Sequence, residues 1–122
     1  MIKVIGVKWI NAAAKEAEVT ISNGHSEIVC FSQPFNLSES DELVQPLFCL
    51  NVHNILKSNS DCFAVEKQGE SFGFFLRGRI INLNEKIVDV EGYLISLDEA
   101  DFPGDLIEGD FIEFMVSRLD IY

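Results

Sequence analysis

The stretch EAEVTISNG, residues 16–24, decides the fold class of this chain. Its first seven residues alternate between polar and apolar, which places the apolar side chains on one face of a strand. Asn23 and Gly24 follow, and this pair predicts a tight hairpin turn because both residues readily adopt positive φ. The apolar run at residues 27–32 then predicts the returning strand. The chain is therefore expected to be all-β.

The same period-two pattern recurs along the chain in short runs that are separated by turn residues. Further strands are expected in the segments 1–9, 47–50, 62–66, 71–83, 86–97 and 111–121. Seven or eight short strands at this spacing predict a small antiparallel barrel, closed or partly open, in a single domain of residues 1–122. One short helical turn is expected near residues 51–57, where the apolar residues lie at helical spacing.

Two strands carry more detailed expectations. Ile5, Val7 and Trp9 share a face of the first strand, so we expect their side chains in the core. The apolar phase shifts after Gly92, which predicts a β-bulge at this glycine.

Both ends of the chain resemble a known barrel. The segment 106–114 contains a turn, Glu108-Gly109-Asp110, that leads into an apolar strand and resembles the closing hairpin of oligonucleotide/oligosaccharide-binding (OB) folds. The segment 17–31 is similar to the early strands of such barrels. The pattern as a whole is similar to that of small uncharacterised bacterial OB-fold-like β-barrel proteins. This resemblance implies a barrel and brings no catalytic residues with it.

Acidic residues are concentrated in the last third of the chain. The formal net charge is −11, and residues 87–122 hold ten acids against a single base, Arg118. Such a field repels nucleic acid and anionic membranes and favours a basic protein partner. The alternative is a solvated acidic surface with no partner. The candidate partner surface consists of Asp98, Glu99, Asp101, Asp105 and Glu108.

A second candidate surface lies on the strand expected at residues 71–83. Its Phe72-Gly73-Phe74 stretch resembles the motif with which RNA-recognition and cold-shock domains stack bases. Alternation, however, places Phe72 and Phe74 on the core face, together with Leu76 and Ile80. We therefore expect these aromatic side chains to be buried.

The opposite face of this strand presents Phe75, Arg77 and Arg79, which include two of the three arginines in the chain. Arginine suits bidentate contact with phosphate or carboxylate. This face could hold a nucleotide, an oligonucleotide or an oligosaccharide. The alternative is that the arginines pair with Asp89 and Glu91 on the next strand.

No motif points to an enzyme, a cofactor or a metal. Cys49 and His53 are the only close pair of metal-ligating residues, and in a strand they would lie about 13 Å apart. Cys30, Cys49 and Cys62 make an odd number in a chain without a secretion signal, so we expect reduced, buried thiols. No apolar run approaches the roughly 20 residues of a membrane helix. The expected protein is a cytoplasmic, non-catalytic binding module, for example an immunity protein or inhibitor that captures a basic toxin or nuclease.

Overall fold

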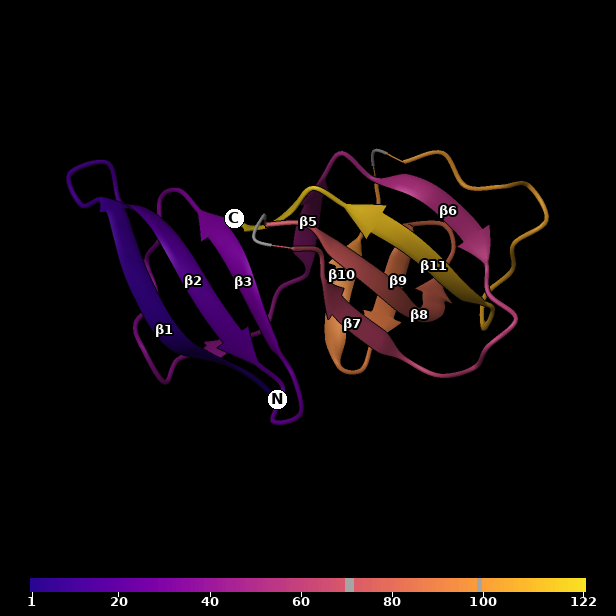
Figure 1. Ribbon diagram of the computed structural model, residues 1–122, viewed down its shortest axis with the longest axis horizontal. Coiled ribbons are helices and arrows are strands. Elements are labelled where there is room, and N and C mark those ends of the chain that lie inside the picture. The colour runs from indigo at the N-terminus through magenta and orange to yellow at the C-terminus, as the bar shows by residue number, and fades with distance from the viewer. Residues whose placement is uncertain (70–71, 99) are drawn as a thin grey trace.

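The computed structural model describes residues 1–69, 72–98 and 100–122, and within these ranges every regular element is a strand (Figure 1). The prediction of an all-β chain is confirmed. No helix in the described ranges is long and apolar enough to cross a membrane. The strands are β1 Ile2–Asn11, β2 Glu16–Ser22, β3 Glu27–Ser32, β4 Glu42–Leu43, β5 Leu47–Leu50, β6 His53–Lys57, β7 Ala64–Lys67, β8 Phe74–Asn82, β9 Ile87–Val90, β10 Tyr93–Ser96, β11 Phe111–Val116 and β12 Arg118–Ile121.

The strands form one mixed sheet that does not close into a barrel. Its hydrogen-bonded order is β4-β1-β2-β3-β12-β5-β10-β9-β8-β11-β6, with β7 added to β8. Two pairs are parallel, β12 with β3 and β10 with β5, and the path runs from β4 to β6 without returning. The expected antiparallel OB-like barrel of seven to eight strands is therefore not supported. Figure 1 shows β1–β3 on one side and β5–β11 on the other, with the C-terminus between them.

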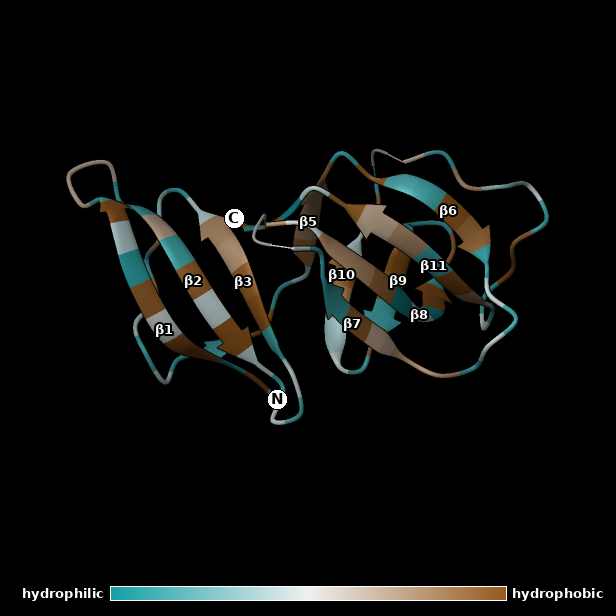
Figure 2. Ribbon diagram, in the orientation of Figure 1, coloured by the Kyte–Doolittle hydropathy of each residue, from teal (hydrophilic) through white to brown (hydrophobic). Residues whose placement is uncertain are grey.

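The core follows the alternation that the sequence predicts. Every second residue of β2 and β3 is buried, and Figure 2 shows apolar and polar bands alternating along β1 and β2. The buried side chains form one cluster that includes Val19, Ile28, Leu76, Val88 and Ile112. Burial of each large aliphatic side chain contributes about 1.5–3 kcal/mol before the cost of ordering the chain. The inward faces of the strands therefore supply the main stabilising contribution.

The short helical turn expected at residues 51–57 is wrong, because this segment forms β6 and pairs with β11. Asn54 has a φ of 59°, and the register shifts along β6, where Leu56 lies opposite Glu113 and His53 lies opposite Met115. Such a bulge inserts one extra residue into a strand. The extra residue displaces the apolar side chains from a strict period of two, which produces the apparent helical spacing.

Gly92 also differs from its prediction. Glu91 and Gly92 both have positive φ, 52° and 99°, and together they form the two-residue turn between β9 and β10. Val90 and Tyr93 lie opposite each other on either side of this turn. The change of apolar phase therefore marks a hairpin and not a bulge within one strand.

The first strand buries a different set of residues from the expected one. Ile2 and Val4 are in the core, whereas Ile5 is 44% exposed and Trp9 is 49% exposed. A register shift between Val4 and Gly6 changes the phase of the strand at this point. After the shift Val7 lies opposite the buried Val19 and is partly buried against the core, so the prediction of a core face is confirmed in part for Val7 and is wrong for Ile5 and Trp9.

A tyrosine links the two groups of strands. The hydroxyl of the buried Tyr93 donates to the carbonyl of Ser26 at 2.7 Å and accepts from the N–H of Asn23 at 3.1 Å. The side-chain amide of Asn23 donates to the carbonyl of Glu91 at 2.8 Å. These bonds fasten the β2–β3 turn to the β9–β10 turn, at a contact that no strand pairing makes.

Candidate functional site

The face formed by Phe75, Arg77 and Arg79 lies on β8, as the sequence predicts, but its partners differ. Nε and Nη2 of Arg77 donate to Oε2 of Glu113 at 3.2 and 3.1 Å. The guanidinium also lies 5.6 Å from the centre of the Phe75 ring. Arg77 is therefore neutralised by β11, and the expected partners on the β9 side are wrong for this arginine. The reason is topological: β7 and β11 flank β8 at Arg77, while β9 first pairs with β8 at Arg79.

Arg79 is exposed and lies opposite Asp89 in the β8–β9 register. The Asp89 carboxylate accepts the N–H of Gly92 at 2.8 Å, and the described residues contain no ion pair with Arg79. Of the two arginines of this face, Arg77 is thus paired with a carboxylate of the described residues and Arg79 is not. Of the aromatic side chains expected in the core, Phe74 is buried, as predicted, but Phe72 is 37% exposed.

The third arginine, Arg118, pairs with a carboxylate on its own strand. Arg118 Nε donates to Oδ1 of the buried Asp120 at 2.6 Å, and its guanidinium lies 4.3 Å from the centre of the Phe31 ring. The charge of the Arg118 guanidinium is therefore balanced by the Asp120 carboxylate within the sheet.

The acidic loop, residues 97–110, connects β10 to β11 and is held at several points. Leu106 is buried, and Lys86 donates from Nζ to the carbonyl of Ala100 at 2.6 Å. The same ammonium lies 5.7 Å from the centre of the Phe102 ring. Glu108 accepts the N–H of Leu83 at 3.1 Å, so one of the predicted surface acids helps to anchor the loop.

The other predicted acids stand free of the loop's internal contacts. Asp98, Asp101 and Asp105 are exposed, and none of them forms a hydrogen bond or ion pair with another described residue. Glu99 lies outside the described residues. Asp110, in contrast, accepts the N–H of Ile107 at 3.1 Å and lies 3.6 Å from Nζ of Lys57. The described part of the loop is therefore anchored at Ala100, Leu106 and Glu108 and carries three unpaired carboxylates.

A groove of about 570 Å³ separates this loop from β6. Residues 100–103 line one side, and residues 52–55 line the other. Asp101 is the carboxylate on its wall, and His53 lies across from it. The sequence does not reveal this groove, because residues 51–57 are expected to be helical.

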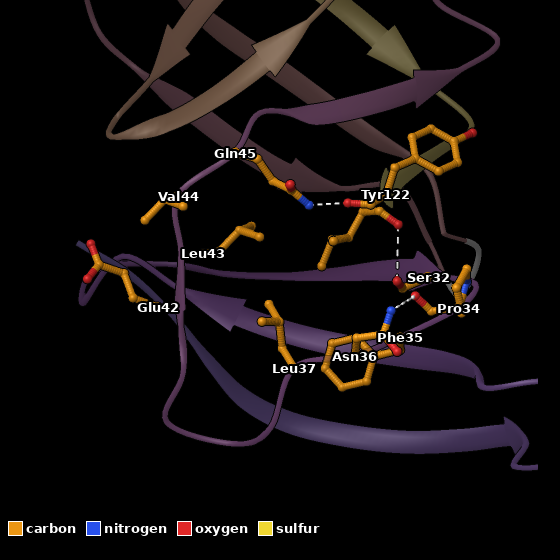
Figure 3. A pocket seen from close by; sticks show the side chains of 11 residues that line it. Ser32, Pro34, Phe35, Asn36, Leu37, Glu42, Leu43, Val44, Gln45 and Tyr122 are labelled. Atoms are coloured by element: carbon orange, nitrogen blue, oxygen red, sulfur yellow. Dashed lines mark hydrogen bonds between the residues drawn. The ribbon is translucent and has the colours of Figure 1, made fainter.

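A smaller pocket of about 180 Å³ lies between the loop after β3 and the C-terminal residue (Figure 3). Phe35, Leu43 and Ile121 give it a largely apolar wall. Ser32 donates to the carbonyl of Ile121 at 3.0 Å, and the side-chain amide of Gln45 donates to the carbonyl of Tyr122 (Figure 3). These two polar side chains at the rim of the pocket therefore donate their hydrogen bonds to backbone carbonyls. The sequence does not predict this pocket, because residues 33–45 have the composition of a polar loop.

The metal-ligating side chains of the described ranges do not gather at one place. No three His, Cys, Asp or Glu side chains come close enough there to hold a metal ion. All three thiols are free; Cys30 is buried, but Cys62 is exposed, contrary to expectation. Burial, reinforced by the charge of Asp120, raises the pKa of the Cys30 thiol far above its ordinary value, which disfavours the reactive thiolate form.

Comparison with protein-family models, with curated proteins and with solved structures finds no match to this chain.

Proposed function

We propose that this protein is a non-catalytic binding module that captures a basic protein partner through its acidic loop, as an immunity protein or inhibitor does. One observation carries the proposal: the loop is anchored by Leu106 and Lys86, yet it leaves Asp98, Asp101 and Asp105 exposed and unpaired. Carboxylates on an anchored loop lose less conformational freedom when they meet a cationic surface than carboxylates on an unanchored one.

Charge supports the same assignment. The formal net charge of −11 attracts a basic protein over several ångströms and speeds the encounter, an effect that salt screens. Each exposed ion pair contributes only about 0.2–1 kcal/mol once formed. The loop is therefore expected to act chiefly on the association rate, while neighbouring apolar contacts slow dissociation.

The rival role, a nucleotide, oligonucleotide or oligosaccharide site at Phe75, Arg77 and Arg79, has weaker support. Arg77 is already bound to Glu113, and the overall charge opposes a polyanion. The three free thiols fit the cytoplasmic location that we also propose.

The test compares two triple variants that remove the same charge from different places. Asp98→Asn/Asp101→Asn/Asp105→Asn neutralises the acidic loop, and Glu16→Gln/Glu18→Gln/Glu27→Gln removes three charges from β2 and β3. The probes are cationic ribonucleases, and association rates are measured by stopped flow at low and high salt. We expect the loop variant to associate at least tenfold more slowly at low salt and the control variant to stay within about twofold. Equal slowing in both variants, or no association of any probe at low salt, would overturn the proposal.

A further inference from the structure

The outer edge of β1 is only partly covered. β4 pairs with it at Ile2 and Lys3, and Val4 exchanges backbone bonds with the segment before β4: its N–H donates to Asp41 at 2.9 Å, and its carbonyl accepts from Ser40 at 2.7 Å. Beyond Val4, no strand in the described ranges pairs with this edge. Figure 1 shows β1 at the outer end of its group of strands.

The register of β2 shows which backbone groups point to this edge. Val4 directs its N–H and carbonyl outward, so its partner Ile21 must direct its own groups toward β3. Alternation along β2 then gives Val19 and Ala17 the same orientation. Their partners on β1 are Val7 and Trp9, which therefore present unpaired N–H and carbonyl groups to the open edge.

The side chains beside these groups are apolar and accessible. Trp9 is 49% exposed, and Ile10 is 50% exposed. Val7 and Trp9 share an open groove of about 480 Å³ with Phe35 and Leu37, and the Trp9 and Phe35 ring centres lie 5.9 Å apart. An uncovered edge with exposed apolar side chains favours the addition of another strand.

Charge indicates what kind of strand it takes. Residues 1–32 hold three lysines and three glutamates, so this region is neutral and the rest of the chain carries the whole net charge of −11. A neutral edge offers nothing to a basic partner. It is also the region where two copies of this acidic chain can meet with the least repulsion, because their acidic parts stay apart.

We propose that a second copy of this chain pairs antiparallel along β1, with the two-fold axis at Lys8, and joins the two sheets into one. Register shifts between Val4 and Gly6 and between Trp9 and Asn11 leave residues 6–9 as the regular stretch. With Lys8 at the axis, Val7 of each copy lies opposite Trp9 of the other, and their outward backbone groups bond. Each Lys8 has Glu18 opposite it on β2, which offsets the repulsion between the two lysines. This interface is independent of the proposed function.

Trp9 reports on the interface directly, because it is the only tryptophan in the chain. We expect sedimentation to show a dimer that dissociates on dilution, with the Trp9 emission maximum moving to longer wavelength in parallel. Val7→Pro removes one outward N–H and spares the β1–β2 ladder, so it should weaken dimerisation at least tenfold.

The matched control is Lys57→Pro on β6, the opposite edge of the sheet. The N–H of Ser58 donates to Phe111 on β11, so alternation points the N–H of Lys57 outward as well. This variant should dimerise like the natural chain. A monomer at every concentration, or a dimer that survives Val7→Pro with its circular dichroism unchanged, would overturn the proposal.

A cross-link tests the register without a proline. Opposed residues that do not share ladder bonds lie about 4.5 Å apart at Cα, within the roughly 4.4–6.8 Å that a disulfide spans. In a Cys62→Ser background, Lys8→Cys should form a covalent dimer with oxidised glutathione. Lys3→Cys, whose edge is covered by β4, should stay monomeric. Equal cross-linking at both positions would contradict the register.

Discussion

Replacing Gly78 with alanine tests a close approach between β8 and β9. Gly78 is buried in β8, between Arg77 and Arg79. A Cβ there would lie 2.5 Å from the Asp89 carbonyl oxygen, 2.6 Å from Cγ2 of Val90 and 3.0 Å from the Asp89 carbonyl carbon. Two of these atoms belong to the β9 backbone, which cannot move aside as a side chain can.

The expected change in the free energy of unfolding is the difference between two opposing effects. Inserting a group into a filled core costs about 1–3 kcal/mol, and a clash with backbone belongs at the upper end of that range. Alanine also reduces the freedom of the unfolded chain, which returns about 0.4–1 kcal/mol. We therefore expect Gly78→Ala to lower the free energy of unfolding by about 2 kcal/mol, a large part of the 5–15 kcal/mol typical of a domain.

The assay is urea unfolding followed by circular dichroism, with Gly6→Ala as the matched control. A Cβ at Gly6 would meet Thr20 Cβ at 3.6 Å, an ordinary contact, so this variant should stay within about 0.5 kcal/mol of the natural chain. The predicted loss arises at the contact between β8 and β9. If Gly78→Ala is as stable as Gly6→Ala, the two backbones do not approach closely, and the reasoning fails.

Four further outcomes are expected. Tyr93→Phe removes two hydrogen bonds from the partly buried Asn23 N–H and Ser26 carbonyl, which keep only their mutual bond at 3.4 Å, and should cost about 2 kcal/mol in urea unfolding. Arg77 and Glu113, both partly exposed, should couple by about 0.5–1 kcal/mol in a double-mutant cycle with glutamine at each position; a larger value would contradict the screening that solvent provides. A thiol reagent should label Cys62 at once but Cys30 only on unfolding. Because burial raises the pKa of Cys30, unfolding titrations should show stability falling as pH rises above roughly 8.5, where only the unfolded thiol ionises.

Alternation predicts the strands whose register stays regular. It places the core face of β2 correctly, and on β8 it identifies Phe74, Leu76 and Ile80 as buried. It fails for Ile5 and Trp9 on β1 and for the segment that forms β6, where each strand contains a register shift. A bulge depends on the partner strand as well as on the strand itself, so a local reading of the sequence does not reveal it.

The candidate surfaces likewise combine features that the local sequence predicts with features that depend on distant strands. The exposure of Asp98, Asp101 and Asp105 agrees with the prediction, because charged residues in a loop rich in turn residues are expected at the surface. The Arg77–Glu113 pair depends on which strands lie beside β8, and these come from distant parts of the chain. The contacts of Lys86 that fix the acidic loop are likewise tertiary.

The position of β12 has a consequence for how the chain is made. Residues 118–121 sit between β3 and β5 and are the link in the sheet path between the two groups of strands. During synthesis the β1–β3 hairpins can form within about 1–10 μs of emerging, whereas β12 leaves the ribosome after the other strands of the described residues. Until it arrives, β3 and β5 are both open edges on a nascent chain. The nascent chain is therefore most prone to aggregate just before β12 is added. A chaperone that shields the edges of β3 and β5 would have its largest effect at that stage.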